Sequence, residues 1–260
     1  VGGSAVDTVI VDFSLGELPA SLKSGSIEVD GGAGSGKDIF AVATTREADQ
    51  VRLGSTAAVH SIQPGEGLPL LKLTGVESLI VSTGPGRDRI DASGGNGLGS
   101  PLSSGFTVYA GADEDTIQGG AGADQLHAGE GDDLFETAAA SDGGDVYDGG
   151  AGEDSLSYEK RTQPVTIKVD KQPNDGETNE RDDVQDNVET LIGGEGADNI
   201  SAGDNDNTLI GGPGNDVLNG GAGNDTFMET TSAKGADIMN GGPGVDSIDY
   251  SERSTALSIT

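Results

Sequence analysis

The residues of this chain that could do chemistry are aspartates that recur every nine positions, each preceded by glycines. Residues 119–127 read Gly-Gly-Ala-Gly-Ala-Asp-Gln-Leu-His, with glycine at the first, second and fourth places, aspartate at the sixth and a large apolar residue at the eighth. The same frame recurs at 149–157, 193–201, 211–219, 220–228 and 241–249, and looser copies lie at 83–91, 110–118, 128–136 and 202–210. Glycine permits tight turns whose carbonyl groups can face inward. Carbonyl and carboxylate oxygens together favour a hard cation such as calcium.

The composition restricts both the core and the partners. Of the 260 residues, 45 are glycine and only 3% are aromatic, so a conventional aromatic core is unavailable, whereas a stack of repeats with one apolar residue per rung is possible. The formal net charge of −31 argues against nucleic acid or an anionic membrane as a partner. The chain has no cysteine, and no apolar run is long enough to span a membrane. We expect a segment of a longer protein, since 256–260 reads as an interrupted strand.

A longer repeat is superimposed on the nonapeptides. Residues 119–168 align without a gap to 211–260, an offset of 92 positions. In both units three extra residues, at about 137–139 and 229–231, precede the next aspartate in phase, Asp145 or Asp237. We predict that the two units are structurally equivalent and that the extra residues are extruded as a bulge. Tyr147 and Met239 then fall at the inward eighth place.

The repeat predicts its own geometry. The first six places form a turn and the last three a short strand, so two repeats make one flattened coil with two turns. Turns nine residues apart lie on opposite edges, and turns eighteen residues apart are stacked neighbours. The eighth-place residues should point inward: Ile90, Ile117, Leu126, Phe135, Leu156, Ile200, Leu209, Leu218, Phe227 and Ile248. The predicted fold is all-β, a right-handed parallel β-roll (a β-solenoid) of stacked nonapeptides.

The chain divides into four predicted regions. Residues 1–82 form a degenerate, β-rich version of the same stack that has lost most turn aspartates, with strands at 8–13, 26–29 and 38–42. Residues 83–170 form a first calcium-binding unit, 171–192 an acidic connecting turn, and 193–260 a second unit. The acidic stretch 174–189 either holds a separate calcium ion or is a solvated loop.

These repeats resemble the RTX (repeat-in-toxin) hemolysin-type calcium-binding family, specifically over 110–260, moderately over 83–110 and weakly over 1–82. The resemblance implies several calcium ions between stacked turns, bound by sixth-place side chains and turn carbonyls. The implied side-chain ligands are Asp88, Asp115, Asp124, Asp133, Asp145, Asp154, Asp198, Asn207, Asp216, Asp225, Asp237 and Asp246. The implied turn residues are Gly119, Gly120, Ala121, Gly122, Gly129, Gly131, Gly149, Ala151, Gly193, Glu195, Gly211, Gly212, Pro213, Gly214, Gly220, Gly221, Ala222, Gly223, Gly241 and Pro243.

Turns on one edge recur every second repeat, so sixth-place residues should pair across one intervening repeat. The predicted pairs are Asp115–Asp133, Asp124–Asp145, Asp133–Asp154, Asp198–Asp216, Asn207–Asp225, Asp216–Asp237 and Asp225–Asp246. Asn207 offers a neutral oxygen, so its site should be weaker. Ala110 and Ala128 replace a leading glycine and retain its carbonyl, whereas Asp113 replaces a fourth-place glycine and puts the geometry of that turn in doubt.

Enzymatic signals are weak. Residues 31–37 match the glycine and lysine positions of a phosphate-binding loop, but Asp38 stands where serine or threonine is needed and 39–42 looks like a strand. The resemblance implies secretion from a Gram-negative bacterium. We therefore expect a non-catalytic segment of a secreted or cell-surface protein that folds into a rigid rod on binding calcium, with a role in adhesion, surface-layer or matrix assembly. Self-association, other extracellular proteins and glycans are possible partners. The alternative is the repeat module of a secreted enzyme or toxin whose catalytic domain lies outside this segment.

Overall fold

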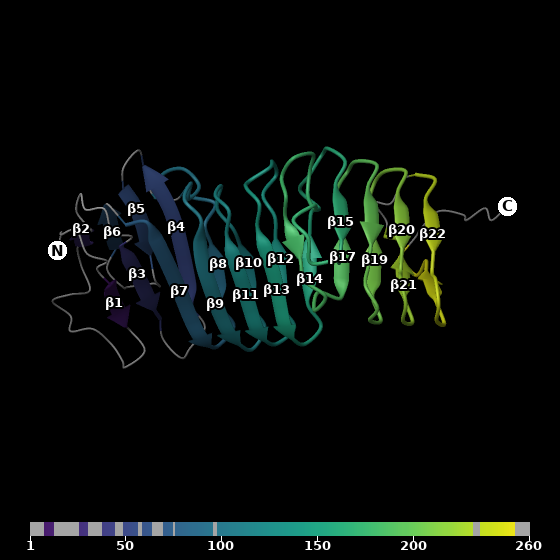
Figure 1. Ribbon diagram of the computed structural model, residues 1–260, viewed down its shortest axis with the longest axis horizontal. Helices are drawn as coiled ribbons and strands as arrows, with labels where there is room; N and C mark the ends of the chain where they lie inside the picture. The colour runs from purple at the N-terminus through teal and green to yellow at the C-terminus, as the bar shows by residue number, and fades with distance from the viewer. Residues whose placement is uncertain are drawn as a thin grey trace.

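The computed structural model describes residues 8–12, 26–30, 38–44, 49–56, 59–63, 70–74, 76–95, 98–230 and 235–252. All regular elements in these ranges are β-strands. Within them there is no helix long and apolar enough to cross a membrane. The strands stack side by side along the long axis of an elongated molecule (Figure 1). They form three sheets.

One face of the molecule consists of a seven-stranded and a four-stranded sheet. The seven-stranded sheet has the order β1 (Thr8–Asp12), β3 (Ile39–Ala43), β7 (Ser78–Pro85), β9 (Phe106–Ala112), β11 (Gln125–Glu130), β13 (Val146–Ala151) and β16 (Asp183–Val184). The four-stranded sheet has the order β15 (Thr166–Lys168), β18 (Asn199–Ser201), β20 (Val217–Asn219) and β22 (Ile238–Asn240).

The other face is a single twelve-stranded sheet. Its order is β2 (Ser26–Asp30), β6 (Leu70–Thr74), β5 (Val59–Gln63), β4 (Gln50–Thr56), β8 (Arg89–Asp91), β10 (Thr116–Gln118), β12 (Leu134–Glu136), β14 (Ser155–Ser157), β17 (Thr190–Ile192), β19 (Thr208–Ile210), β21 (Thr226–Met228) and β23 (Ser247–Asp249). From β8 to β14 and again from β17 to β23 the chain alternates between the two faces, as a β-roll requires, whereas the consecutive strands β15 and β16 both lie on the first face.

The strand register confirms the eighteen-residue stacking. Ile117 lies opposite Phe135, and Leu209 lies opposite Phe227, in parallel pairs. Eighth-place side chains therefore stack on eighth-place side chains. The prediction of a parallel β-roll is correct.

The stack continues past both three-residue insertions. Leu126 pairs with Tyr147, and Leu218 pairs with Met239, so the register continues across twenty-one residues instead of eighteen. The predicted equivalence of the two long units is confirmed over the strands that the structure describes. Residues 231–234 and 253–260 of the second unit lie outside the described residues.

The core is a file of eighth-place side chains between the two faces. Nearly all those predicted to point inward are buried, including Leu126, Phe135 and Leu209, which are fully enclosed. Ile248 is the exception, because its side chain is 47% exposed. It lies on β23, the last strand of its sheet, and no rung within the described residues follows to cover it.

The N-terminal strands β1, β2 and β3 lie where the sequence predicts strands. The predicted single stack is wrong in one respect, because β5 pairs in antiparallel fashion with both β4 and β6. Residues 31–37, which match part of a phosphate-binding loop, lie outside the described residues. The next element is the strand β3 and not the helix that such a loop needs.

The first face has a discontinuity, which we call the seam, between β16 and β15. The side chain of Asp175 bridges it: Oδ1 accepts a hydrogen bond from the Lys168 backbone N–H on β15 at 2.6 Å, and Oδ2 accepts one from the Val184 N–H on β16 at 3.1 Å. This carboxylate is 1% exposed and takes the place of a peptide group in the sheet. The proposed division of the chain at residues 82, 170 and 192 stays a prediction.

Candidate metal centre

The sixth-place side chains form two columns, one along each edge of the roll. The first column contains Asp49, Asp88, Asp115, Asp133, Asp154, Glu189, Asn207, Asp225 and Asp246. The second contains Asp124, Asp145 and Asp182 before the seam, and Asp198, Asp216 and Asp237 after it. Within a column, one carboxylate oxygen of each acid generally accepts a hydrogen bond from the sixth-place N–H of the turn before it.

The seven predicted pairs all stand next to each other in these columns. In every pair, Oδ1 of the later residue lies 2.7 to 3.1 Å from the backbone nitrogen of the earlier residue. The predicted stacking across one intervening repeat is therefore confirmed. That the pairs share a metal ion stays a proposal.

The second oxygen of these side chains has no partner along most of the first column. Among the described residues, the buried oxygens without a hydrogen bond include Oδ2 of Asp88, Asp115, Asp133, Asp154 and Asp225 and Oδ1 of Asn207. A buried polar atom without a partner loses its hydration and gains nothing in return. A cation between the turns would remove that penalty, so the first column fits calcium.

In the second column, more of the carboxylate oxygens accept hydrogen bonds from the protein itself. Gly120 N–H donates to Oδ2 of Asp124 at 2.8 Å, and the Tyr158 hydroxyl donates to Oδ2 of Asp182 at 2.6 Å. In this column only Asp216 keeps a buried oxygen without a partner among the described residues. A metal ion here would have to displace hydrogen bonds that the first column lacks.

Backbone groups must complete any site. In the part of the chain that the structure describes, no three acidic or histidine side chains converge as a metal cluster. Each stacked pair supplies at most two side chains, whereas calcium takes six to eight oxygens. The turn carbonyls are the remaining oxygen donors, as the sequence predicts.

The leading glycine has a steric role that the sequence did not reveal. A methyl group on Gly193 would lie 2.5 Å from Oδ2 of Asp198, and one on Gly119 would lie 2.9 Å from Oδ2 of Asp124. The glycine therefore makes room for the carboxylate of its own repeat. Asp113 adopts a positive φ of 76°, and fourth-place glycines such as Gly223 also have a positive φ. The turn therefore keeps its backbone conformation with aspartate in place of glycine.

Burial raises the pKa of these carboxyls well above the usual value. The pKa is raised to about 6 at Asp88 and Asp216, about 7 at Asp115, Asp124 and Asp154, about 8 at Asp182 and about 9 at Asp145. Loss of hydration is the largest cause at each, and neighbouring carboxylates in the column add to it at most of them. Without metal, Asp145 and Asp182 therefore hold protons at neutral pH.

This predicts an inverted pH dependence for the metal-free chain. Because the folded-state pKa values lie above the ordinary 3.8, protonation stabilises the roll fully below about pH 4, and that stability is lost as pH rises through about 6 to about 9. In excess chelator, the sheet signal in circular dichroism should increase from pH 8 to pH 4. With saturating calcium the trend should reverse, because protons and calcium compete for the same oxygens. A metal-free chain that is more ordered at pH 8 than at pH 4 would contradict this.

Sequence reasoning missed three column members: Asp49, Asp182 and Glu189. Their turns lack the glycine pattern, but each acid stands two positions before a buried apolar residue, as a sixth-place residue does. Those apolar residues are Val51, Val184 and Leu191, all fully enclosed. The N-terminal part, which was expected to have lost most turn aspartates, thus keeps Asp49. It also keeps Asp38, which likewise precedes buried Phe40.

The acidic stretch 174–189 is not a solvated loop throughout, and a separate calcium ion there stays a prediction. Glu180 and Asp182 are buried and thus not part of a solvated loop. Arg161, fully buried, forms ion pairs with Glu180 and with Asp142 of the first bulge, both at 2.6 Å, and with Glu177 at 3.4 Å. A guanidinium group thus supplies the positive charge beside the seam.

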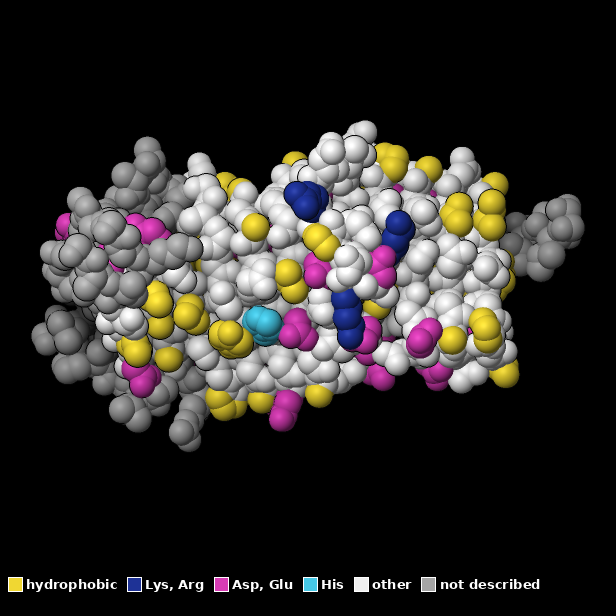
Figure 2. All heavy atoms as spheres, viewed as in Figure 1, with side chains coloured by type: hydrophobic (Ala, Val, Ile, Leu, Met, Phe, Trp, Pro, Cys, Tyr) yellow, Lys and Arg dark blue, Asp and Glu magenta, His cyan; other side chains and the backbone are white. Residues whose placement is uncertain are grey.

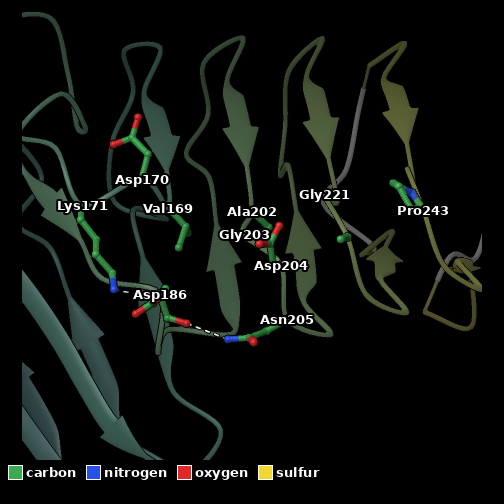
Figure 3. A pocket seen from close by; sticks show the side chains of 11 residues that line it. Val169, Asp170, Lys171, Asp186, Ala202, Gly203, Asp204, Asn205, Gly221 and Pro243 are labelled. Carbon is green, nitrogen blue, oxygen red and sulfur yellow. Dashed lines mark hydrogen bonds and ion pairs between the residues drawn. The ribbon is translucent and has the colours of Figure 1, made fainter.

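The turn that carries Glu189 departs from the nine-residue frame. Leu191 follows Val184 after seven positions instead of nine, so the turn between them is two residues short. A hollow of about 560 Å³ lies here, lined by Lys171, Asp186 and Asn205 among others (Figure 3). Lys171 Nζ pairs with Asp186 at 2.8 Å.

Figure 2 shows the Lys and Arg side chains of the viewed face over the middle of the molecule, around β14 and β17.

The comparison with known proteins agrees with this geometry. No curated protein sequence is significantly similar to the chain. The family model of the RTX calcium-binding nonapeptide repeat matches in four copies, at residues 107–136, 137–157, 189–227 and 233–251. These ranges contain most of both columns and the first bulge, and the second bulge lies between the last two ranges. The four matched segments are therefore repeats of the RTX calcium-binding family.

Proposed function

We propose that this chain is a non-catalytic segment that binds several calcium ions between stacked turns and is folded by them. The observation that carries the proposal is the row of buried, unpartnered oxygens along the first column, from Asp88 to Asp225. Calcium bound there would neutralise pairs of stacked carboxylates. The sixth-place side chains of this chain already hold the preceding turn through their other oxygen, so each aspartate can serve both the fold and the ion.

The two columns should differ in calcium affinity. The first column offers unpartnered oxygens on both sides of the Asp133 turn, in Asp115 and Asp154. In the second column, the oxygens of Asp124 and Asp182 already accept hydrogen bonds. We therefore place the tighter ions in the first column. Asn207 lies in that column, and its neutral oxygen should bind more weakly.

The larger role follows from the family. RTX repeats are typical of proteins secreted by Gram-negative bacteria, and we propose that this segment acts outside the cell. There the calcium-bound rod would serve adhesion, surface-layer or matrix assembly, in contact with copies of itself, other extracellular proteins or glycans. The stiffness of the stacked rungs and the high net charge of −31 support a soluble spacer of this kind.

Two neighbouring substitutions test calcium binding. Asp133→Asn removes a buried sixth-place charge, and Asp132→Asn removes an exposed fifth-place charge in the same turn. In isothermal titration with calcium, Asp133→Asn should lose at least one high-affinity ion, whereas Asp132→Asn should keep the full number. Equal losses in both variants would mean that net charge alone attracts calcium. Absence of high-affinity binding to the unsubstituted chain would refute the proposed function.

A further inference from the structure

The turns carry a second ladder of side chains at the fifth place, on the solvent side of the calcium columns. Asp132 Oδ1 accepts a hydrogen bond from the Glu153 N–H at 3.0 Å, and Asn215 Oδ1 accepts one from the Ala236 N–H at 2.9 Å. The next turns show the same contact: Asp206 with the Asn224 N–H at 2.6 Å, and Asn224 with the Val245 N–H at 3.0 Å. In each case a fifth-place side chain holds the fifth-place peptide of the next rung.

The side chains that make this contact are all of the same length. Every aspartate or asparagine at the fifth place of a described repeat makes it, namely Asp132, Asp206, Asn215 and Asn224. Glutamate at that place, as at Glu153, makes no such bond among the described residues. In the residues that bond, Cβ is the one methylene between Cα and the carboxamide or carboxylate, and this reach matches the distance between stacked turns.

The fifth-place ladder runs against the direction of the sixth-place columns. Asp225 Oδ1 holds the turn before it through the Asn207 N–H, whereas Asn224 Oδ1 holds the turn after it through the Val245 N–H. Asp225 is buried and has an unpartnered second oxygen, and Asn224 is exposed. Adjacent residues of one turn thus face the two neighbouring rungs, and the turn that carries Asp246 is positioned by Asn224.

We propose that aspartate or asparagine at the fifth place is a positioning residue for calcium. By holding the peptide of the next turn in place, it sets the calcium affinity of the site between the two turns. The inference rests on the proposed function. It assigns these side chains a role as acceptors of one N–H and not as metal ligands. The oxygen and not the charge matters, because Asn215 and Asn224 make the same bond as Asp132 and Asp206.

Substitutions at Asp206 separate the hydrogen bond from the charge. Asp206→Ala removes both, whereas Asp206→Asn removes the charge and keeps the Oδ1 acceptor. Loss of one hydrogen bond should raise the calcium concentration needed to order the adjacent turns by about three- to tenfold. We expect this shift in Asp206→Ala and restoration to within about twofold in Asp206→Asn. Glu153→Ala is the control for the loss of a fifth-place charge that holds no turn.

Two readouts in the full chain decide the matter: calcium titration followed by circular dichroism, and hydrogen exchange of the Asn224 amide at saturating calcium. The proposal predicts faster exchange of that amide in Asp206→Ala and near-normal exchange in Asp206→Asn. It is overturned if Asp206→Asn weakens calcium binding as much as Asp206→Ala, or if neither variant changes it. If the unsubstituted chain binds no calcium, the proposed function has failed as well. If it binds calcium through Asp133 and only Asp206 is silent, this inference alone has failed.

Discussion

Excess chelator at pH 7 should unfold most of the chain, and calcium should restore the sheet. The net charge is −31, and the buried columns place carboxylates in stacked pairs without a countercharge. Each pair costs desolvation and mutual repulsion, which the small apolar core of one side chain per repeat is too weak to offset. Calcium binding then supplies the folding free energy. Far-ultraviolet circular dichroism during a calcium titration measures the transition directly.

Magnesium is the control for this result. It requires a smaller and stricter octahedral site and gives up its water reluctantly, so it should restore little of the sheet signal at the same concentration. A full sheet signal in chelator at pH 7 would show that the roll folds without metal. Equal recovery with magnesium would show that charge neutralisation alone is sufficient.

Replacement of Arg161 by methionine should destabilise the calcium-saturated protein by about 3–5 kcal/mol, as expected when one partner of a buried ion pair is removed. The guanidinium is fully buried, and its loss leaves Asp142 and Glu180 facing each other without a countercharge. The effect should be concentrated at the seam, where β15 and β16 do not pair directly and are linked through residues 175–176. Denaturant unfolding at saturating calcium measures the loss.

Two further variants distinguish the loss of the buried ion pairs from a general loss of stability. Arg87→Met removes an exposed arginine that pairs with Glu114 at 2.6 Å, and it should cost no more than about 1 kcal/mol. Combining Arg161→Met with Asp142→Asn and Glu180→Gln should recover a large part of the loss, because the two buried acidic partners of Arg161 are then neutral. No recovery in the triple variant would mean that the packing of Arg161, and not its charge, stabilises the seam.

The parts of this fold that repeat were predictable from sequence. Each rung contacts only its neighbours, so an inward residue such as Leu209 and a turn residue such as Asp225 follow from the local frame. The bulges were predictable for the same reason, since Tyr147 and Met239 return to the inward place after them. The agreement ends at Ile248, where the next rung is needed to cover the side chain.

The seam was not predictable, because no local frame governs it. Arg161 meets Asp142 and Glu180, each nineteen positions away, through an excursion that follows no repeat. Asp175 links two strands through its side chain, which no strand pattern indicates. The overlooked members of the columns are a different case. Their signal is an acid two positions before an apolar residue. It is present at Glu189 without the glycines that mark the other turns.

A calcium-bound crystal structure tests the central claim most directly. The account predicts an ion between each stacked pair of the first column, with the unpartnered oxygens of residues such as Asp133 and Asp154 at about 2.3–2.6 Å from it. The remaining ligands should be turn carbonyls, and Oδ1 of each aspartate should still accept the N–H of the preceding turn. Ions bound elsewhere, between repeats adjacent in sequence or only at the exposed fifth-place carboxylates, would contradict it.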